Sequence, residues 1–477
     1  MNSAPQAHGP SPDSDAESKE YLRKIERLAN FFISGKFGSS ADLWNFQIEL
    51  MELQRKIQDS IAAEKERIRR SKVKSDRLQN LKYARYSARR LGDSFAWILL
   101  GGDSKVINPL GENSPVPIGK EGHGSRGLVA VSSHLANEGW GFPVIHDITD
   151  LLRIGDVTFL QPGSGEGVRT VELKTRHLGD DNDIGGSSHY EVSVNFMAHK
   201  DDPVIELSAD IEKRSSDERI GATADETPKP PRRDDRRIAR QAKRMARALT
   251  RQRAQDGEVS TIDGEDFITA VISPSPLSHW KDLRRAIREA RANGYSSMLV
   301  DKAFLYAAFY DASGLEEGSF QNSQFIEDVT SSGLVRSRVN ERNSLQIYSI
   351  PEGETRRPQQ YLPYFLYSIP KRAVFDLLRG RLQIIVVANA GHIADALEDA
   401  GFDVTIPKDS ESPIHSIEIS AQVEHEGVGY RFRTDTVGHR VLDCVYGVKG
   451  IDYLLKAAQK MKETIPPLIK DKNAGGE

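Results

Sequence analysis

The sequence predicts a mixed α/β protein with an N-terminal helical region, an α/β core and a C-terminal α/β domain. Apolar residues recur at helical spacing in the first hundred residues, and short strand-like segments alternate with helices from residue 125 onward. The chain of 477 residues is long enough for about three domains. We expect a disordered tail at 1–17, a helical arm or hairpin at 18–90, the core at 91–310 with an acidic insertion at 176–233, and the last domain at 311–477.

Composition excludes several classes of protein. Hydrophobic residues make up 38% of the chain, which is enough to build cores and excludes wholesale disorder. The single cysteine, Cys444, permits neither an intrachain disulfide nor a cysteine-based zinc site, and it favours a cytoplasmic location. No apolar run approaches the ~18 residues of a membrane span. The N-terminus lacks the apolar segment of a signal peptide, so we expect no membrane partner.

The N-terminal region follows one long amphipathic pattern. Its apolar residues share a helix face, with Ser40 as the expected N-cap; they are Leu43, Phe46, Leu50, Ile57 and Ile61. The pattern then turns basic up to residue 90, and a separate apolar helix is expected at 91–102. This arm would either grip nucleic acid or pack against another chain, as a homo-oligomer or with a partner subunit.

The core begins with a helix at 125–138, whose apolar positions repeat at helical spacing. Three strands follow, within 142–148, 153–160 and 168–176. The Gly-rich run at 161–167 joins the last two strands as a hairpin turn.

Later elements complete the pattern. They are a strand pair near 189–198 and 202–211, a basic amphipathic helix at 236–253, a strand at 266–274, a helix at 277–295, a strand at 296–301, a strand–helix–strand unit at 381–408, a hairpin at 414–436 and a closing helix at 450–465. The turn at 389–392 could meet an anion, although a plain structural turn explains it as well.

Charge is segregated along a chain whose net charge is only −4. Residues 65–90 hold eleven basic and two acidic side chains, and 229–253 hold the same numbers. Residues 176–226 hold thirteen acidic and five basic side chains. Such blocks indicate basic faces for a polyanion, or else solvated helix faces.

Three residues of the hairpin carry the chemistry. Glu172 and Lys174 are two apart on one strand and therefore lie on the same face, and the hairpin brings Asp156 beside them. Two neighbouring carboxylates repel each other unless a cation neutralises them, and Mg²⁺ prefers oxygen ligands. The metal activates water and polarises a phosphoryl oxygen, while the lysine stabilises the charge that develops. This set is sufficient to hydrolyse a phosphodiester.

An acid-x-Lys triplet also occurs by chance. A second one, Asp103-Ser104-Lys105, follows a helix and has no strand with an upstream acid, so we reject it. The competing interpretation of Glu172 and Lys174 is an exposed hairpin with a charged face.

The order helix, three strands with Asp then Glu-x-Lys, basic helix and strand resembles the αβββαβ core of the PD-(D/E)XK, or restriction-endonuclease-like, nuclease superfamily. The resemblance covers roughly residues 91–310 and implies that Asp156 and Glu172 bind Mg²⁺ or Mn²⁺ and that Lys174 is catalytic. It also implies that the basic helix packs behind the sheet and presents Arg240, Gln241 or Lys243 to the site.

The chain departs from the family pattern in three places. Gly155, not proline, precedes Asp156, and an insertion of roughly 58 residues separates the Glu-x-Lys strand from the basic helix. A further acid on the first helix would have to be Glu121 or Glu138.

We therefore expect a Mg²⁺-dependent nuclease that acts on DNA rather than RNA, in restriction or anti-phage defence by analogy with the superfamily. Phosphate contacts are expected from the basic residues of 65–90, from the start of the helix at 125–138 and from the basic helix at 236–253; in the last two they are Arg126, Arg237, Arg240, Gln241, Lys243, Arg244 and Arg247. The alternative is a nucleic-acid-binding or scaffold protein on a nuclease-like fold that does not cleave.

Overall fold

The computed structural model of the chain describes most of its secondary structure. The described residues are 16–35, 37–73, 75–101, 107, 123–152, 156–160, 168–177, 190–196, 207–211, 259–262, 265–268, 278–310, 323–335, 344–351, 362–407, 413–425, 428–434 and 437–474. The architecture is mixed α and β, and every strand pair among these residues is antiparallel.

Contacts divide the chain into two compact units. The five-stranded unit comprises Arg27–Val73 and Ala88–Gln252, and the four-stranded unit comprises Met1–Glu26, Lys74–Ser87 and Arg253–Glu477. The division runs through two helices, α1 (Ala16–Ile33) and α3 (Asp76–Leu99). The predicted four-part division of the chain stays a prediction.

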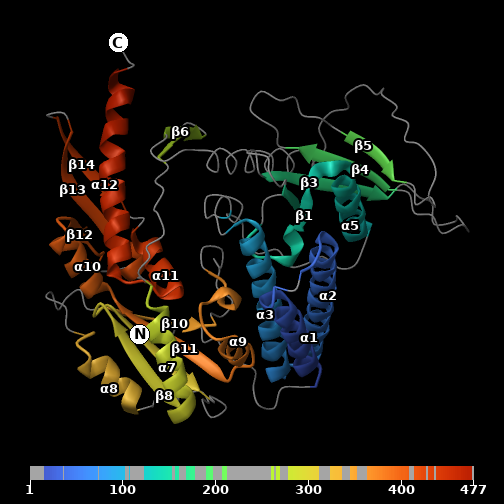
Figure 1. Ribbon diagram of the computed structural model, residues 1–477, viewed down its shortest axis with the longest axis horizontal. Helices are drawn as coiled ribbons and strands as arrows, with labels where there is room; N and C mark the ends of the chain where they lie inside the picture. The colour runs from blue at the N-terminus through green and yellow to red at the C-terminus, as the bar shows by residue number, and fades with distance from the viewer. Residues whose placement is uncertain are drawn as a thin grey trace, which may run out of the picture. The chain divides into compact units, whose positions relative to one another are not determined.

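Three helices form the N-terminal region, which confirms the predicted helical region (Figure 1). Between α1 and α3 lies α2 (Ser40–Ser71). One phenylalanine from each helix joins an aromatic cluster: the ring of Phe46 stacks on Phe32 at 5.8 Å and on Phe95 at 5.0 Å. Such pairs stabilise a core beyond the area they bury.

The helix α2 begins and ends at residues other than those that the sequence pattern indicated. The N-cap is Ser39, not Ser40, because Ser39 and Asp42 form a capping box in which each side chain accepts the other's backbone N–H. At the other end Lys72 adopts the left-handed conformation and stops the helix. The separate helix expected at 91–102 is wrong, since α3 runs unbroken from Asp76 to Leu99.

The five-stranded sheet has the order β1-β2-β3-β4-β5. Its strands are β1 (Phe142–Ile145), β2 (Val157–Leu160), β3 (Val168–His177), β4 (Tyr190–Phe196) and β5 (Leu207–Ile211). The predicted three strands, the hairpin pairing of β2 with β3, and the strand pair of the acidic segment are therefore confirmed. The strands of the acidic segment extend the same sheet as the candidate site.

Strand β2 is covered on both faces. The predicted first helix is present as α5 (His123–Leu135), followed by the π-helical turn η1 (Ala136–Trp140), and the Trp140 ring contacts Phe159 at 5.9 Å. On the other face, Leu160 packs against a cluster that contains Ala96 and Leu100 from the end of α3.

The four-stranded unit is built on the sheet order β10-β11-β9-β8. Its strands are β8 (Tyr295–Val300), β9 (Phe304–Tyr310), β10 (Leu345–Ile350) and β11 (Leu382–Asn389). Strand β9 pairs with β11, so this sheet joins residues on both sides of position 310, where the sequence places a domain boundary. Helices α7 (Trp280–Asn293) and α9 (Lys371–Leu378) contact its strands (Figure 1).

Smaller elements complete this unit. They are β6 (Val259–Ile262), β7 (Glu265–Ile268), α8 (Ser323–Ser331), α10 (Ala390–Asp399), β12 (Asp403–Thr405), β13 (Glu418–His425), β14 (Val428–Thr434), α11 (Val437–Gly447) and α12 (Ile451–Ala474). The predicted strand–helix–strand unit is present as β11, α10 and β12, but β11 and β12 join different sheets. Within the described ranges, every helix is too short or too polar to cross a bilayer.

A close approach of backbones fixes α3 in the five-stranded unit. A Cβ atom on Gly92 would lie 1.8 Å from the carbonyl oxygen of Ile148. We expect Gly92→Ala to lower the free energy of unfolding by about 3 kcal/mol, because backbone lies on both sides of the new methyl group.

Urea denaturation measures this effect, with Gly38→Ala as the matched control. At Gly38 the new atom would meet only the end of the Asp42 side chain, at 3.4 Å. Equal stability of the two variants would show that α3 does not need this approach.

Candidate active site

Asp156 immediately precedes β2, the first strand of the β2–β3 hairpin. Val157 pairs with Val171, and the backbone N–H of Asp156 donates to the carbonyl of Val171 at 2.8 Å. The ladder ends at Val157, and Asp156 lies just before β2, with its N–H on the residue that precedes Glu172. Asp156 itself is half-buried.

Strand β3 continues past the start of β2. Glu172 pairs with Asn195 of β4, and Lys174 pairs with Ser193. On one side, the described neighbour of positions 172 and 174 is therefore β4. On the other side, Asp156 immediately precedes β2. Alternation along β3 assigns positions 172 and 174 to the face of Thr170. The side chains of Glu172 and Lys174 lie outside the described part of the structure.

A buried polar row runs across this face. His146, Thr158 and Thr170 are each less than 5% exposed. The Nε2 atom of His146 lies 2.7 Å from Oγ1 of Thr158, which lies 2.9 Å from Oγ1 of Thr170. Asp156 lies just before β2, and its backbone carbonyl accepts the N–H of His146 at 2.9 Å, so the row begins beside Asp156.

A buried carboxylate holds the turn at 146–152, which follows β1 and leads to β2. Oδ1 of Asp93 on α3 accepts from Thr149 Oγ1 at 2.6 Å and from the backbone N–H groups of Asp150 and Leu151 at 2.6 and 3.0 Å. Arg90 donates to Oδ2 of the same carboxylate at 3.3 Å. Burial raises the pKa of Asp93 above its ordinary value, against the opposing effect of the Arg90 guanidinium.

Glutamine side chains of α2 hold the backbone beside this turn. Gln47 donates to the carbonyl of Pro143 and accepts from the N–H of Ile145, both at 2.9 Å, so it pairs with the edge strand β1 as another strand would. Gln54 donates to the carbonyl of Ile148 at 2.8 Å. The backbone N–H of His146 then donates to the carbonyl of Asp156 at 2.9 Å.

The structure describes the other predicted site residues only in part. Arg126 lies in the first turn of α5, but its side chain is outside the described part, as is all of Glu121. Glu138 is exposed on η1, which packs through Trp140 against Phe159, on the face of β2 opposite Thr158. The basic helix at 236–253, with the remaining predicted phosphate contacts, falls outside the described residues.

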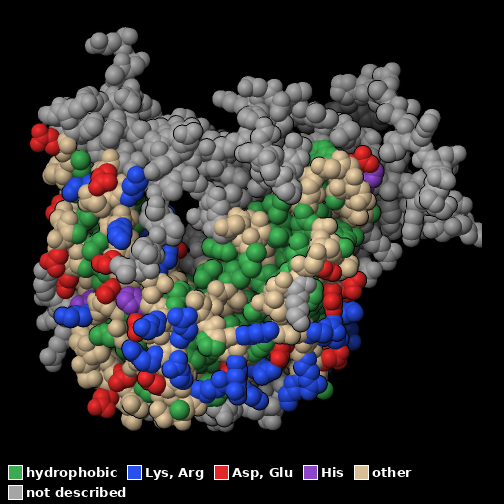
Figure 2. Space-filling model, in the orientation of Figure 1, with side chains coloured by type: hydrophobic (Ala, Val, Ile, Leu, Met, Phe, Trp, Pro, Cys, Tyr) green, Lys and Arg blue, Asp and Glu red, His purple; other side chains and the backbone are tan. Residues whose placement is uncertain are grey.

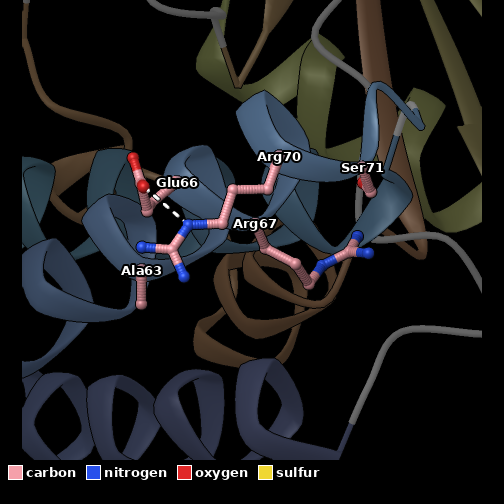
Figure 3. Close-up of a pocket in the computed structure, with 5 residues that line it drawn as sticks. All are labelled: Ala63, Glu66, Arg67, Arg70 and Ser71. Carbon is pink, nitrogen blue, oxygen red and sulfur yellow. Dashed lines mark hydrogen bonds and ion pairs between the residues drawn. The ribbon is translucent and has the colours of Figure 1, made fainter.

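The basic block at 65–90 is not a single face. Arg67 pairs with Glu64, and Arg69 and Arg70 both pair with Glu66 on the same helix. Figure 3 shows Arg70 reaching Glu66 beside a pocket of about 520 Å³ at the end of α2, lined also by Ala63, Arg67 and Ser71. No predicted catalytic residue lines that pocket.

The far end of the block is buried. Arg89 is 7% exposed and donates to the carbonyls of Asp147 and Thr149, and Arg90 is 2% exposed beside Asp93. A phosphate-binding role for these two arginines is therefore wrong, since they hold the turn at 146–152 instead.

Two further sequence interpretations have clear structural outcomes. The strand expected at 266–274 begins as β7, which pairs with β6 in a two-stranded sheet. At the turn 389–392, the Asn389 side chain accepts the Gly391 N–H at 2.7 Å, and His392 Nε2 lies 2.8 Å from the carbonyl of Gly333. The polar groups of this turn thus serve the helix cap and the local packing.

A metal site here would depend on Glu172. Among the side chains that the structure describes, no three His, Cys, Asp or Glu residues gather closely enough to hold a metal ion, and Glu172 is not one of those side chains. The donor chemistry of two carboxylates fits a hard cation, and the backbone of Asp156 contacts Val171, the residue before Glu172.

Sequence reasoning missed the residues that support the site. His146 follows a strand, and Thr158 and Thr170 alternate with apolar residues, so each could have been assigned to one strand face. Their pairing depends on the register. Asp93 is a polar residue inside an apolar helix, and only its partners in the turn at 146–152 reveal its role.

Comparison with known proteins found no match. No family model, no curated protein and no solved structure is similar to this chain.

The buried polar row yields a prediction about stability. We expect Thr158→Val, which keeps the side-chain shape, to cost about 1–3 kcal/mol, because it leaves His146 and Thr170 without their shared hydroxyl partner.

The matched control is Thr330→Val. Its hydroxyl is exposed and bonds to the Ile326 carbonyl at 2.8 Å, so we expect a change within about 0.5 kcal/mol. Urea midpoints at constant m-value compare the two. A cost at Thr158 no larger than at Thr330 would contradict the importance of the row.

Proposed function

We propose that this chain is a metal-dependent nuclease that hydrolyses phosphodiester bonds, with DNA as the favoured substrate. The observation that supports the proposal most is the backbone contact between Asp156 and β3. The hydrogen bond from Asp156 to Val171 brings the first acid beside the Glu-x-Lys positions of β3. The rejected triplet at 103–105 has no comparable strand partner in the sequence pattern.

Each residue has a distinct role in this proposal. Asp156 and Glu172 would hold Mg²⁺, with Mn²⁺ as a substitute. The bound ion polarises a phosphoryl oxygen and lowers the pKa of a water. The Lys174 ammonium stabilises the negative charge that develops on the phosphate and orients the attacking water. The row from His146 to Thr170 holds the register of β2 against β3.

The substrate and setting are part of the same proposal. Arg126 and the basic helix at 236–253 would contact phosphates without reading bases, so affinity would depend on salt. A cytoplasmic role in restriction or anti-phage defence follows by analogy with nucleases that carry this motif.

The second candidate is a nucleic-acid-binding or scaffold protein without cleavage. Two observations favour it. Strand β7 pairs with β6 rather than with the five-stranded sheet, and Glu138 belongs to an element on the face of β2 opposite Thr158. The two candidates differ in one measurable property, which is metal-dependent turnover.

Plasmid cleavage tests the nuclease directly. We expect nicking or linearisation in Mg²⁺ or Mn²⁺ and none in EDTA. Lys174→Ala should lower the rate by about 10²-fold or more, since it removes charge stabilisation made in the transition state. Glu172→Gln should abolish the response to metal.

Lys105→Ala is the matched control, because it changes the lysine of the other acid-x-Lys triplet. It should cleave at the wild-type rate. Metal-dependent cleavage that survives both Lys174→Ala and Glu172→Gln would refute this site, and no cleavage on any substrate would favour the scaffold.

A further inference from the structure

The four-stranded unit carries a second basic surface, outside every segment for which the sequence predicted phosphate contacts. We call it the α7–α9 surface. Its members are basic residues on α7, on the first turn of α9 and just after α9: Lys281, Arg284, Arg285, Arg288, Lys371, Arg372, Arg379 and Arg381. Figure 2 shows Lys and Arg side chains gathered where α7 and α9 lie in Figure 1.

The fold makes this surface by burying the other side of α7. Leu283, Ala286, Ile287 and Ala290 are buried, and α7 contacts β8 and β9. The stripe of Lys281, Arg285 and Arg288 is therefore left exposed.

Direct contacts join α7 to the segment around α9. Arg291 pairs with Asp376 at 3.0 Å, and the rings of Trp280 and Tyr367 lie 5.0 Å apart. The basic side chains of the two helices consequently belong to one surface.

The acidic side chains at this surface have partners: Glu26 pairs with Arg379, and Glu289 accepts a hydrogen bond from Ser296. Asp376 is buried and paired with Arg291, and Asp282 pairs with Arg285 at 3.0 Å. Lys281, Arg288 and Arg372 form no hydrogen bond or ion pair with the residues that the structure describes. Three cations thus remain available for an external anion.

The chemistry of the surface favours a repeating phosphate over a protein or a membrane. Protein interfaces use apolar or aromatic anchors, and membrane-binding helices expose an apolar face. The large exposed apolar residues of the described chain all lie elsewhere; they are Val73, Ile98, Leu299, Ile326, Leu345 and Ile347. Lys281 and Arg288 are seven residues apart, or about 10 Å along the helix, which suits several phosphates in a row. Arginine also binds phosphate in a bidentate manner.

We propose that the α7–α9 surface binds the sugar–phosphate backbone of nucleic acid and holds substrate for the chain. The substrate class rests on the proposed nuclease function, but the binding step requires neither metal nor Asp156, Glu172 and Lys174. The surface contacts phosphates only, so its affinity is independent of base sequence.

The test is fluorescence anisotropy of the full chain with labelled 30-base-pair DNA of two unrelated sequences, in EDTA. The triple variant Lys281→Gln/Arg288→Gln/Arg372→Gln should bind at least tenfold more weakly at 100 mM salt. The slope of log Kobs against log salt should fall by about 2 to 3, as expected for three lost phosphate contacts. The melting temperature of this variant should equal that of the wild type, because the three substituted residues are exposed and have no described partners.

The control is Lys19→Gln/Lys56→Gln/Lys456→Gln, which removes three exposed positive charges from α1, α2 and α12. It should keep both the affinity and the salt slope of the wild type. Equal losses in the two triple variants would overturn the proposal, because net charge alone would then explain binding. Unchanged binding by the α7–α9 variant would also overturn it.

Two further binding measurements distinguish an acidic protein partner and an error in the catalytic site from the proposed role. Labelled polyglutamate that binds this surface as tightly as DNA would overturn the proposal in favour of an acidic protein partner. Lys174→Ala should bind DNA like the wild type in EDTA. If Lys174→Ala still cleaves while the α7–α9 variant fails to bind, the catalytic site is wrong and the binding surface stands.

Discussion

The buried carboxylate of Asp93 is the constraint on which the five-stranded unit depends. One of its oxygens accepts three hydrogen bonds from the turn at 146–152, and the other faces Arg90. A buried charge is tolerable only when it is paired and hydrogen-bonded, so the turn has little freedom to move away from α3. Gly92 permits the close approach that these bonds require.

This constraint reaches the candidate site through backbone contacts. The turn at 146–152 begins at His146, whose N–H donates to the carbonyl of Asp156 while its ring contacts Thr158. Asp156 is thus held from both sides, by His146 and by the Val171 carbonyl on β3. Gln47 satisfies the outer edge of β1, which a sheet would otherwise leave open to pairing with another chain. A rigid scaffold of this kind is what a site needs if charged groups are to be preorganised.

Basic residues serve two physical roles in this chain, and their burial separates the roles. Arg89 and Arg90 occur in a strongly basic stretch, yet they are buried and satisfy carbonyls and a carboxylate. Lys281 and Arg288 lie on a helix that also contains acids, yet they are exposed without described partners. Charge counts along the sequence therefore do not show which basic residues are exposed.

The sequence by itself determined the local elements. Periodicity identified the N-terminal helices, α5, the three strands through β3, the strand pair of the acidic segment and α7. This was possible because the spacing of apolar residues along the sequence differs between helices and strands. It also predicted Asp156 beside the Glu-x-Lys strand, and the Asp156 N–H donates to Val171 of that strand, while the approach of the Glu172 and Lys174 side chains stays a prediction. Tertiary structure alone decided the continuous α3, the pairing of β9 with β11 across residue 310, and the row from His146 to Thr170. These features come from contacts between residues distant along the chain, and no local pattern encodes such contacts.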